Sequence, residues 1–143
     1  MSEITVKVVD YQTSAELIRA IRFAVFVHEQ GVPEQLEMDG QDEAATHVLA
    51  WSGAQAVGTG RMLADGHLGR IAVLREFRNR GVGRLIMARL LETAAATGLP
   101  EVWLSSQRHA CGFYRKLGFV EVGENYLEAG IEHQQMRHRF PRR

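Results

Sequence analysis

The chain lacks the features that mark secreted and membrane-spanning proteins. One cysteine among 143 residues excludes an internal disulfide and suits a reducing compartment. No run of ~18 apolar residues is present, which argues against a membrane-spanning helix. The N-terminus has no basic segment followed by an apolar core, so no signal peptide is predicted. These absences together predict a cytoplasmic protein without a membrane partner.

The chain also lacks an excess of charge of either sign. Seventeen Lys and Arg residues balance 17 Asp and Glu residues, so no global basic field exists to attract nucleic acid. Apolar residues make up 45% of the chain, which is enough for a core without disulfides or metals. We therefore expect residues 1–143 to form a single domain.

Hydrophobic periodicity predicts both strands and helices. Strand patterns cover residues 4–9, 46–51, 54–63, 67–74, 101–105, 119–122 and 133–140. One helical pattern begins at Thr13, which has capping-box spacing to Glu16, and the others cover residues 82–97 and 110–117. The early strands follow one another as hairpins, whereas the later strands alternate with helices. This order predicts an α+β fold, a mixed sheet with helices on both faces.

A glycine-rich turn joins the strand that ends at Leu74 to the helix that begins at Val82. Its sequence is Arg78-Asn79-Arg80-Gly81-Val82-Gly83-Arg84. Free N–H groups and the positive end of the helix dipole suit an anion there, and arginines supply forked donors for phosphate oxygens. The third glycine of the dinucleotide fingerprint and the Gly-Lys-Ser/Thr of a P-loop are both missing. The turn therefore predicts another diphosphate-bearing ligand, and a purely structural turn is the alternative.

The pattern Arg78-x-x-Gly81-x-Gly83 resembles the pyrophosphate-loop motif of the GCN5-related N-acetyltransferase (GNAT) superfamily, Gln/Arg-x-x-Gly-x-Gly/Ala. The strand over residues 69–74 resembles the family's strand that grips the pantetheine arm of acetyl-CoA. A later segment that also resembles the family reads Gln107-x-x-Ala110-x-x-Phe113-Tyr114-x-x-Leu117-Gly118-Phe119. The resemblance implies a mostly antiparallel central sheet with helices on both faces, and acetyl-CoA as the acyl donor. No metal is predicted.

The resemblance also implies which residues bind the cosubstrate. Main-chain groups of Ile71, Ala72 and Val73 are expected to hold the pantetheine arm and to polarise the thioester carbonyl. The other expected contacts come from Arg78, Asn79, Arg80, Gly81, Val82, Gly83, Arg84 and Gln107. Two N-terminal segments resemble the small bacterial ElaA-like branch of the family, namely Phe26-Val27-x-Glu29-Gln30 and Asp39-x-x-Asp42-x-x-Ala45-x-His47.

Tyr114 is the predicted catalytic residue. A phenol with a pKa near ~10 stays protonated at neutral pH and can neutralise a departing thiolate. A half-buried core aromatic is the alternative interpretation. No general base is singled out, and six candidates that are also explicable as solvated charges or caps are Glu29, Glu37, Asp39, Asp42, His47 and Glu132. Cys111 shares a helical face with Tyr114, so an acyl-cysteine route stands beside the interpretation of a small buried thiol.

The predicted function is an acetyl-CoA-dependent N-acetyltransferase that acts on a primary amine of a small molecule or peptide, by direct transfer in a ternary complex. The alternative is a non-catalytic acyl-CoA-binding regulatory module. Acidic residues between Glu29 and Glu43 hint at a cationic acceptor. Edge strands near the C-terminus allow a homodimer, and no nucleic-acid partner is expected.

Overall fold

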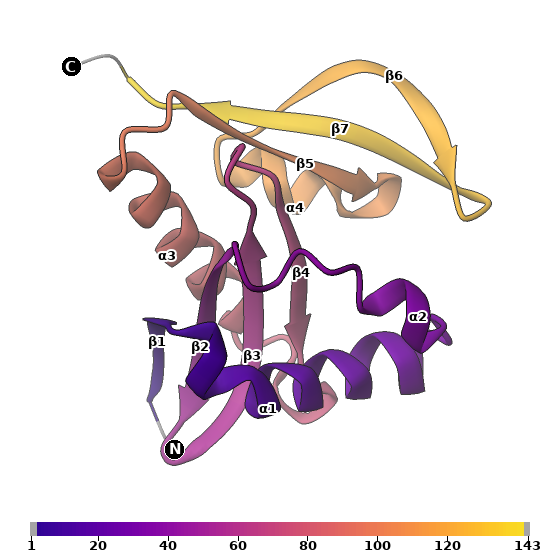
Figure 1. The fold of residues 1–143 in the computed structure, drawn as a ribbon. Coiled ribbons are helices and arrows are strands. Elements are labelled where there is room, and N and C mark those ends of the chain that lie inside the picture. The colour runs from indigo at the N-terminus through magenta and orange to yellow at the C-terminus, as the bar shows by residue number, and fades with distance from the viewer. Residues whose placement is uncertain (1–2, 142–143) are drawn as a thin grey trace.

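Two antiparallel sheets carry the fold (Figure 1). The computed structural model describes residues 3–141. The first sheet has the order β1-β2-β3-β4 and consists of β1 (Ile4–Val9), β2 (Thr46–Ser52), β3 (Gln55–Met62) and β4 (Leu68–Val73). The second has the order β5-β7-β6 and consists of β5 (Glu101–Gln107), β6 (Val120–Glu128) and β7 (Ile131–Arg139). The predicted α+β class with mostly antiparallel pairing is confirmed.

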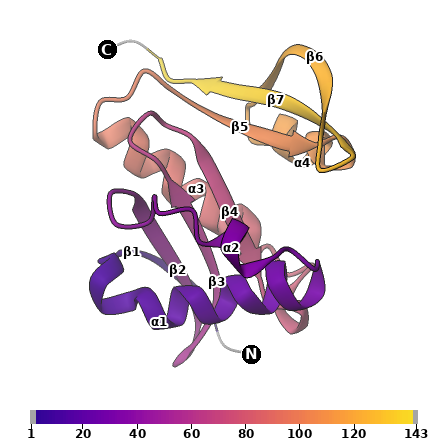
Figure 2. The same ribbon diagram turned by 45° about the vertical axis from the view of Figure 1, so that its right-hand side comes forward.

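Helices cover both faces of the first sheet (Figure 2). On one face, α1 (Tyr11–Arg22) packs through Ile18 and Ile21 against Leu49 of β2, and continues as a π-helical segment, η1 (Phe23–Glu29). On the other face lies α3 (Val82–Ala96), whose Ile86 packs against Val48. The shorter helical segments are α2 (Glu34–Glu37), η2 (Arg75–Phe77), η3 (Arg108–Ala110) and α4 (Cys111–Lys116).

The start of α1 differs from the expectation. Its N-cap is Asp10, whose carboxylate accepts a hydrogen bond from the Thr13 N–H at 3.2 Å. The capping-box assignment to Thr13 and Glu16 is therefore wrong. Asp is a strong N-cap residue, and beginning the helix at Tyr11 buries that ring in the core beneath α1. In the described part of the chain, no helix is both long enough and apolar enough to cross a bilayer.

The two sheets meet at one end of β4 and β5. A parallel bridge joins His67 to Trp103, the Trp103 N–H donates to the Gly66 carbonyl at 3.0 Å, and the two rings stack with centroids 3.9 Å apart. Figure 1 shows the strands diverging from this point. Because β4 and β5 belong to different sheets, their facing edges are open to other partners.

Candidate active site

A cavity of about 630 Å³ opens at the N-terminus of α3. Its lining residues are Val73, Phe77, Arg78, Asn79, Gly81, Val82, Gly83, Arg84, Phe113, Lys116 and Leu117. It thus brings together the end of β4, the glycine-rich turn and α4. Arg80 is not in this lining, because its guanidinium lies over the Phe77 ring at 5.4 Å from the centroid. Lys116 was not predicted from the sequence, and it adds positive charge to the cavity.

The glycines of the turn leave the helix N-terminus accessible. Gly81 is the N-cap of α3 with φ +79°, and the first hydrogen bond of the helix runs from Leu85 N–H to the Gly81 carbonyl at 3.1 Å. The N–H groups of residues 82–84 therefore have no partner within the helix. A Cβ added at Gly83 would meet no protein atom within 4 Å. Packing within the protein therefore does not require glycine at position 83.

Arg78 is held by the protein itself. Its Nε donates to the Val73 carbonyl at 3.0 Å, and its two terminal nitrogens donate to the two oxygens of Glu29 at 2.9 Å and 2.5 Å. These hydrogen bonds, with the charges of Arg78 and Arg75, lower the pKa of the Glu29 carboxyl. Glu29 is thereby tied to the turn, 49 positions away in the sequence, as an ion-pair partner of Arg78.

A β-bulge shapes the middle of β4. The register moves from Thr59↔Ala72 to Arg61↔Gly69, so two residues of β4 lie opposite Gly60. One of them, Arg70, has φ +51°, which is a strained value for a residue with a side chain. A Cβ at Gly60 would come within 2.7 Å of the Ile86 side chain, so only glycine fits opposite the bulge.

The predicted main-chain donors of β4 occupy three different environments. The Leu74 N–H donates to the Val57 carbonyl of β3 at 2.9 Å. Because successive N–H groups of a strand point to alternate sides, the Val73 N–H points away from β3. Val73 lines the first cavity. Ile71 lines a second cavity further along β4. Ala72 lies opposite Thr59 of β3 and is buried beneath α1, in neither of these two linings.

The second cavity has a volume of about 270 Å³ and lies where β4 and β5 diverge. It is lined by Phe26, Gln30, Leu68, Gly69, Arg70, Ile71, Leu104, Ser105, Ser106, Gln107, Ala110, Tyr114 and His133. Both Gln107 and Tyr114 are therefore placed here, beside the bulge. A third cavity of about 520 Å³ shares Phe26 and Arg70 with the second. Its other lining residues are Val32, Leu36, Glu37 and Glu128.

Tyr114 combines core packing with a place in the second cavity. Its ring meets those of Phe113 and Phe119 edge-on, at centroid distances of 5.1 Å and 5.9 Å. Burial, aided by Cys111, raises the pKa of Tyr114. The phenol therefore keeps its proton at neutral pH. Cys111 is buried, with its Sγ 3.7 Å from Ser106 Oγ, as expected of a small buried thiol.

Three of the candidate bases belong to one network of charges, which is sealed from solvent at Glu37 and Asp42 and exposed at Asp39. Arg22 is 1% exposed and donates to Glu37 at 2.5 Å and to Asp42 at 2.7 Å. Arg61 donates to both oxygens of Asp39 at 2.9 Å and to Asp42 at 3.0 Å. Glu37 and Asp42 are only 2% and 4% exposed, so their interpretation as solvated charges or helix caps is wrong. Buried carboxylates need partners, and two guanidiniums supply them.

Arg70 and His47 complete the network. Arg70 reaches Glu37 and Asp39, each at 3.2 Å. His47 is buried and stacks on Tyr11, its Nε2 is 2.8 Å from the Asp42 carbonyl, and burial lowers its pKa. Three arginines thus neutralise three carboxylates. The acidic segment gives little support to a cationic acceptor, because these carboxylates are already paired.

His133 is a cavity residue that was not predicted from the sequence. It is 7% exposed, lines the second cavity, and its Nδ1 lies 2.8 Å from the Ile131 carbonyl. Its Nε2 lies 3.3 Å from Glu128 Oε2. The turn of the β6–β7 hairpin, with φ +53° at Ala129 and +77° at Gly130, sets the register that brings these two side chains together.

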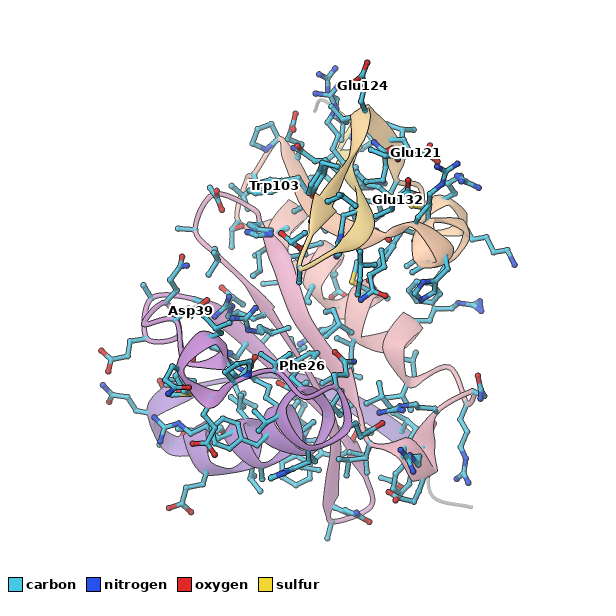
Figure 3. The ribbon with its side chains drawn as sticks, turned by 90° about the vertical axis from the view of Figure 1, so that its right-hand side faces the viewer. Phe26, Asp39, Trp103, Glu121, Glu124 and Glu132 are labelled. Carbon is cyan, nitrogen blue, oxygen red and sulfur yellow. The ribbon has the colours of Figure 1, made fainter. Side chains whose placement is uncertain are left out.

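Glu132, the last candidate base, lies beside His133 in the sequence but outside both the second and the third cavity. Successive residues of a strand face opposite sides, and Glu132 is 59% exposed, 3.6 Å from Arg108. Figure 3 looks onto this side of the molecule, with Phe26 below the hairpin that carries Glu132. Across residues 3–141, no group of three or more His, Cys, Asp or Glu side chains is arranged to hold a metal ion.

Known proteins are similar to this chain over most of its length. Residues 8–140 match the model of the acetyltransferase (GNAT) domain. The chain is 40% identical to the uncharacterised N-acetyltransferase YjcF of Bacillus subtilis over 120 residues, which cover 81% of this chain and 86% of YjcF. It is 35% identical to ElaA of Escherichia coli, with 79% of each chain covered.

Solved structures agree with these matches. The crystal structure of E. coli ElaA superposes with a TM-score of 0.85 and 30% identity over 95% of this chain and 99% of ElaA. An acyl-CoA N-acyltransferase from Pseudomonas aeruginosa superposes with a TM-score of 0.79 and 34% identity, over 96% of this chain and 99% of that one. The resemblance of the N-terminal segments to the ElaA-like branch is therefore confirmed.

Proposed function

The chain belongs to the GNAT acetyltransferase family, and on that premise we propose that it transfers an acetyl group from acetyl-CoA to the primary amine of a small molecule or peptide, directly and within a ternary complex. One observation carries the proposal. Two cavities follow one another along β4, the first at a helix N-terminus beside Val73 and the second around Tyr114, and a third cavity adjoins the second at Phe26 and Arg70. This arrangement lets donor and acceptor approach Tyr114 from opposite ends.

The first cavity fits the diphosphate of coenzyme A. The N–H groups of Val82, Gly83 and Arg84 point out of the helix N-terminus, and Lys116 faces the same space. The Val73 N–H, directed away from β3, would hold the pantetheine arm. Acetyl-CoA, when bound, supplies a thioester carbonyl ready for attack by an amine.

At the second cavity, the protein's own groups would assist the reaction. Of the three predicted donors only Ile71 lines this cavity, so its N–H would stabilise charge on the carbonyl oxygen, an effect of ~3–4 kcal/mol per donor in other enzymes. Tyr114 would give its proton to the departing sulfur, and burial keeps that proton in place at neutral pH. Gln107, also in this cavity, would offer an amide to the cosubstrate.

The test separates the enzyme from a non-catalytic acyl-CoA-binding module. Titration calorimetry with coenzyme A should give saturable heat, and free thiol should be released from acetyl-CoA when a primary amine is added. Binding without thiol release across a broad panel of amines would favour the module. An absence of binding at millimolar coenzyme A would remove both assignments.

A further inference from the structure

We propose that the joined second and third cavities receive the acceptor as a primary ammonium ion, and that His133, supported by Glu128, takes the proton that must leave before the nitrogen can attack. The acceptor class is a monoamine with an apolar body and no carboxylate beside the nitrogen. The inference rests on the proposed acetyl transfer and adds the acceptor's binding site, its chemical class and a proton acceptor.

The position of these cavities suits an acceptor. They are adjacent, because Phe26 and Arg70 line both, and we treat them as one passage: Tyr114 lines the second cavity, and Val32 and Leu36 line the third. Neither lining includes a residue of the glycine-rich turn. An amine entering here reaches the neighbourhood of Tyr114 without crossing the cosubstrate's cavity.

Glu128 is the carboxylate in this passage that is not bound by an arginine in the structure. Glu37 lies within hydrogen-bonding or ion-pairing distance of Arg22 and Arg70, and is 2% exposed. The Glu128 side chain is 60% exposed, and its Oε2 lies 3.3 Å from the Nε2 of His133. It can therefore meet an incoming cation without breaking a buried ion pair.

The contacts of His133 prepare its Nε2 to accept a proton. A carbonyl oxygen can only accept, so the Ile131 carbonyl requires a proton on Nδ1, which leaves the lone pair of the neutral ring on Nε2. Once Nε2 is protonated, the adjacent Glu128 carboxylate stabilises the charge. The side chain is only 9% exposed, so the ring has a fixed position at the wall of the cavity.

The proton balance assigns separate roles to His133 and Tyr114. An ammonium nitrogen carries three protons and the product amide carries one, so two must leave. One N–H bond breaks as an Nε2–H bond forms on His133, and the freed electron pair of nitrogen attacks the thioester carbon. The C–S bond then breaks, Tyr114 protonates the sulfur, and the second nitrogen proton restores the phenol. The proton on His133 passes by way of the exposed Glu128 to water.

The charges of the passage define the acceptor class. A carboxylate beside the nitrogen would lie next to Glu128 and be repelled. The guanidinium of Arg70 offsets this repulsion only in part, because its charge is shared by Glu37 and Asp39 at 3.2 Å each, although its buried Nε has no hydrogen-bond partner among the described residues. Phe26, Val32 and Leu36 suit an apolar body instead. Hence 2-phenylethylamine should be acetylated with a kcat/KM at least about tenfold above that of phenylalanine.

Two variants with matched controls test the pair. His133→Asn should lower kcat/KM for 2-phenylethylamine by about 100-fold. Glu128→Gln should raise KM by about tenfold, because the cation loses its counter-ion. His138→Asn removes an imidazole from the same strand, and Glu132→Gln removes a carboxylate from the outer face of the hairpin. Both controls should stay within about twofold of the parent, and coenzyme A affinity should be unchanged throughout.

Ionisable groups from several elements surround His133. These are Glu128 and Tyr126 from β6, Arg70 from β4 and Tyr114 from α4, with Arg108 and Glu132 on the outer side. A second readout avoids turnover altogether. The imidazole NMR signals of His133 can be assigned by their loss in His133→Asn. They should shift when 2-phenylethylamine is added in the presence of coenzyme A. They should not shift when phenylalanine is added instead.

Failure of this inference is distinguishable from failure of the proposed function. A His133→Asn variant with parental turnover would overturn the role of His133, and so would a His133 NMR signal that does not shift when the amine is added. If the parent acetylates phenylalanine as well as 2-phenylethylamine, the acceptor class is wrong. If the parent releases no thiol with any amine but the His133 signal still shifts, the amine-binding site is supported and the proposed acetyl transfer is contradicted.

Discussion

Two groups of ionisable side chains flank the proposed acceptor passage, and they differ in how completely they are paired. Arg22, Glu37 and Asp42 lie in a sealed network in which each carboxylate meets more than one guanidinium. His133 and Glu128 form an open pair joined by one contact beside a cavity. A fully paired charge holds elements together, here α1, α2 and β3. A sparsely paired charge remains available for binding and proton transfer.

The largest effect that we predict falls on the sealed network. Arg22→Ala should lower the free energy of unfolding by about 3–5 kcal/mol, because it leaves Glu37 and Asp42 buried without one of their partners. Urea unfolding measures this loss. As a control, Arg108→Ala breaks an exposed pair and should cost at most about 1 kcal/mol. Equal losses in the two variants would show that burial does not distinguish the pairs.

Tyr114→Phe should separate activity from stability. The variant keeps the edge-on contacts of the ring with Phe113 and Phe119 but cannot protonate the sulfur. We expect kcat to fall by about 100-fold, while the calorimetric affinity for coenzyme A stays within about twofold. Unchanged kcat would assign Tyr114 to packing alone.

Acid should weaken the network through Asp39. Hydrogen bonds from Arg61 lower the pKa of Asp39 from 3.8 to about 2. A folded-state pKa below the unfolded value stabilises the protein above about pH 4, and this contribution is lost as the pH falls toward about 2. Asp39→Asn should therefore lower the free energy of unfolding by about 1 kcal/mol or less at pH ~6, because Asp39 is exposed and solvent screens its ion pairs. The difference between variant and parent should shrink toward zero near pH ~2, and a difference independent of pH would contradict the assignment.

The smallest predicted effects concern the two glycines of the turn. Gly83→Ala should weaken coenzyme A binding by about tenfold. Its free energy of unfolding should be equal to that of the parent or up to about 1 kcal/mol higher, because alanine favours helix and the added Cβ meets no protein atom within 4 Å. Gly81→Ala should instead cost about 1 kcal/mol of stability, because φ is +79° there. Calorimetry and thermal unfolding of both variants measure these opposite signs. Undiminished affinity in Gly83→Ala would place the diphosphate elsewhere.

Local rules explain which parts of the fold were predictable. The helix that starts at Val82 was predicted to its first residue, because a glycine with positive φ and an apolar periodicity mark that start within a few positions. The N-cap of α1 was misplaced by three residues, because Asp10 and Thr13 are both good caps and only the burial of Tyr11 decides between them. Arg80 is the one residue of the predicted turn that does not line the first cavity. Its guanidinium lies over the Phe77 ring instead.

The amino-acid order by itself determined the succession of strands and helices, the anion-suited turn and the position of Tyr114, since each depends on residues close together in the chain. Tertiary structure alone decided which charges are sealed and which are open. Arg78 meets Glu29 across 49 positions, and Arg22 meets Asp42 across 20. Such pairs form only when packing brings distant segments together and removes water from between them, and no local pattern encodes either event.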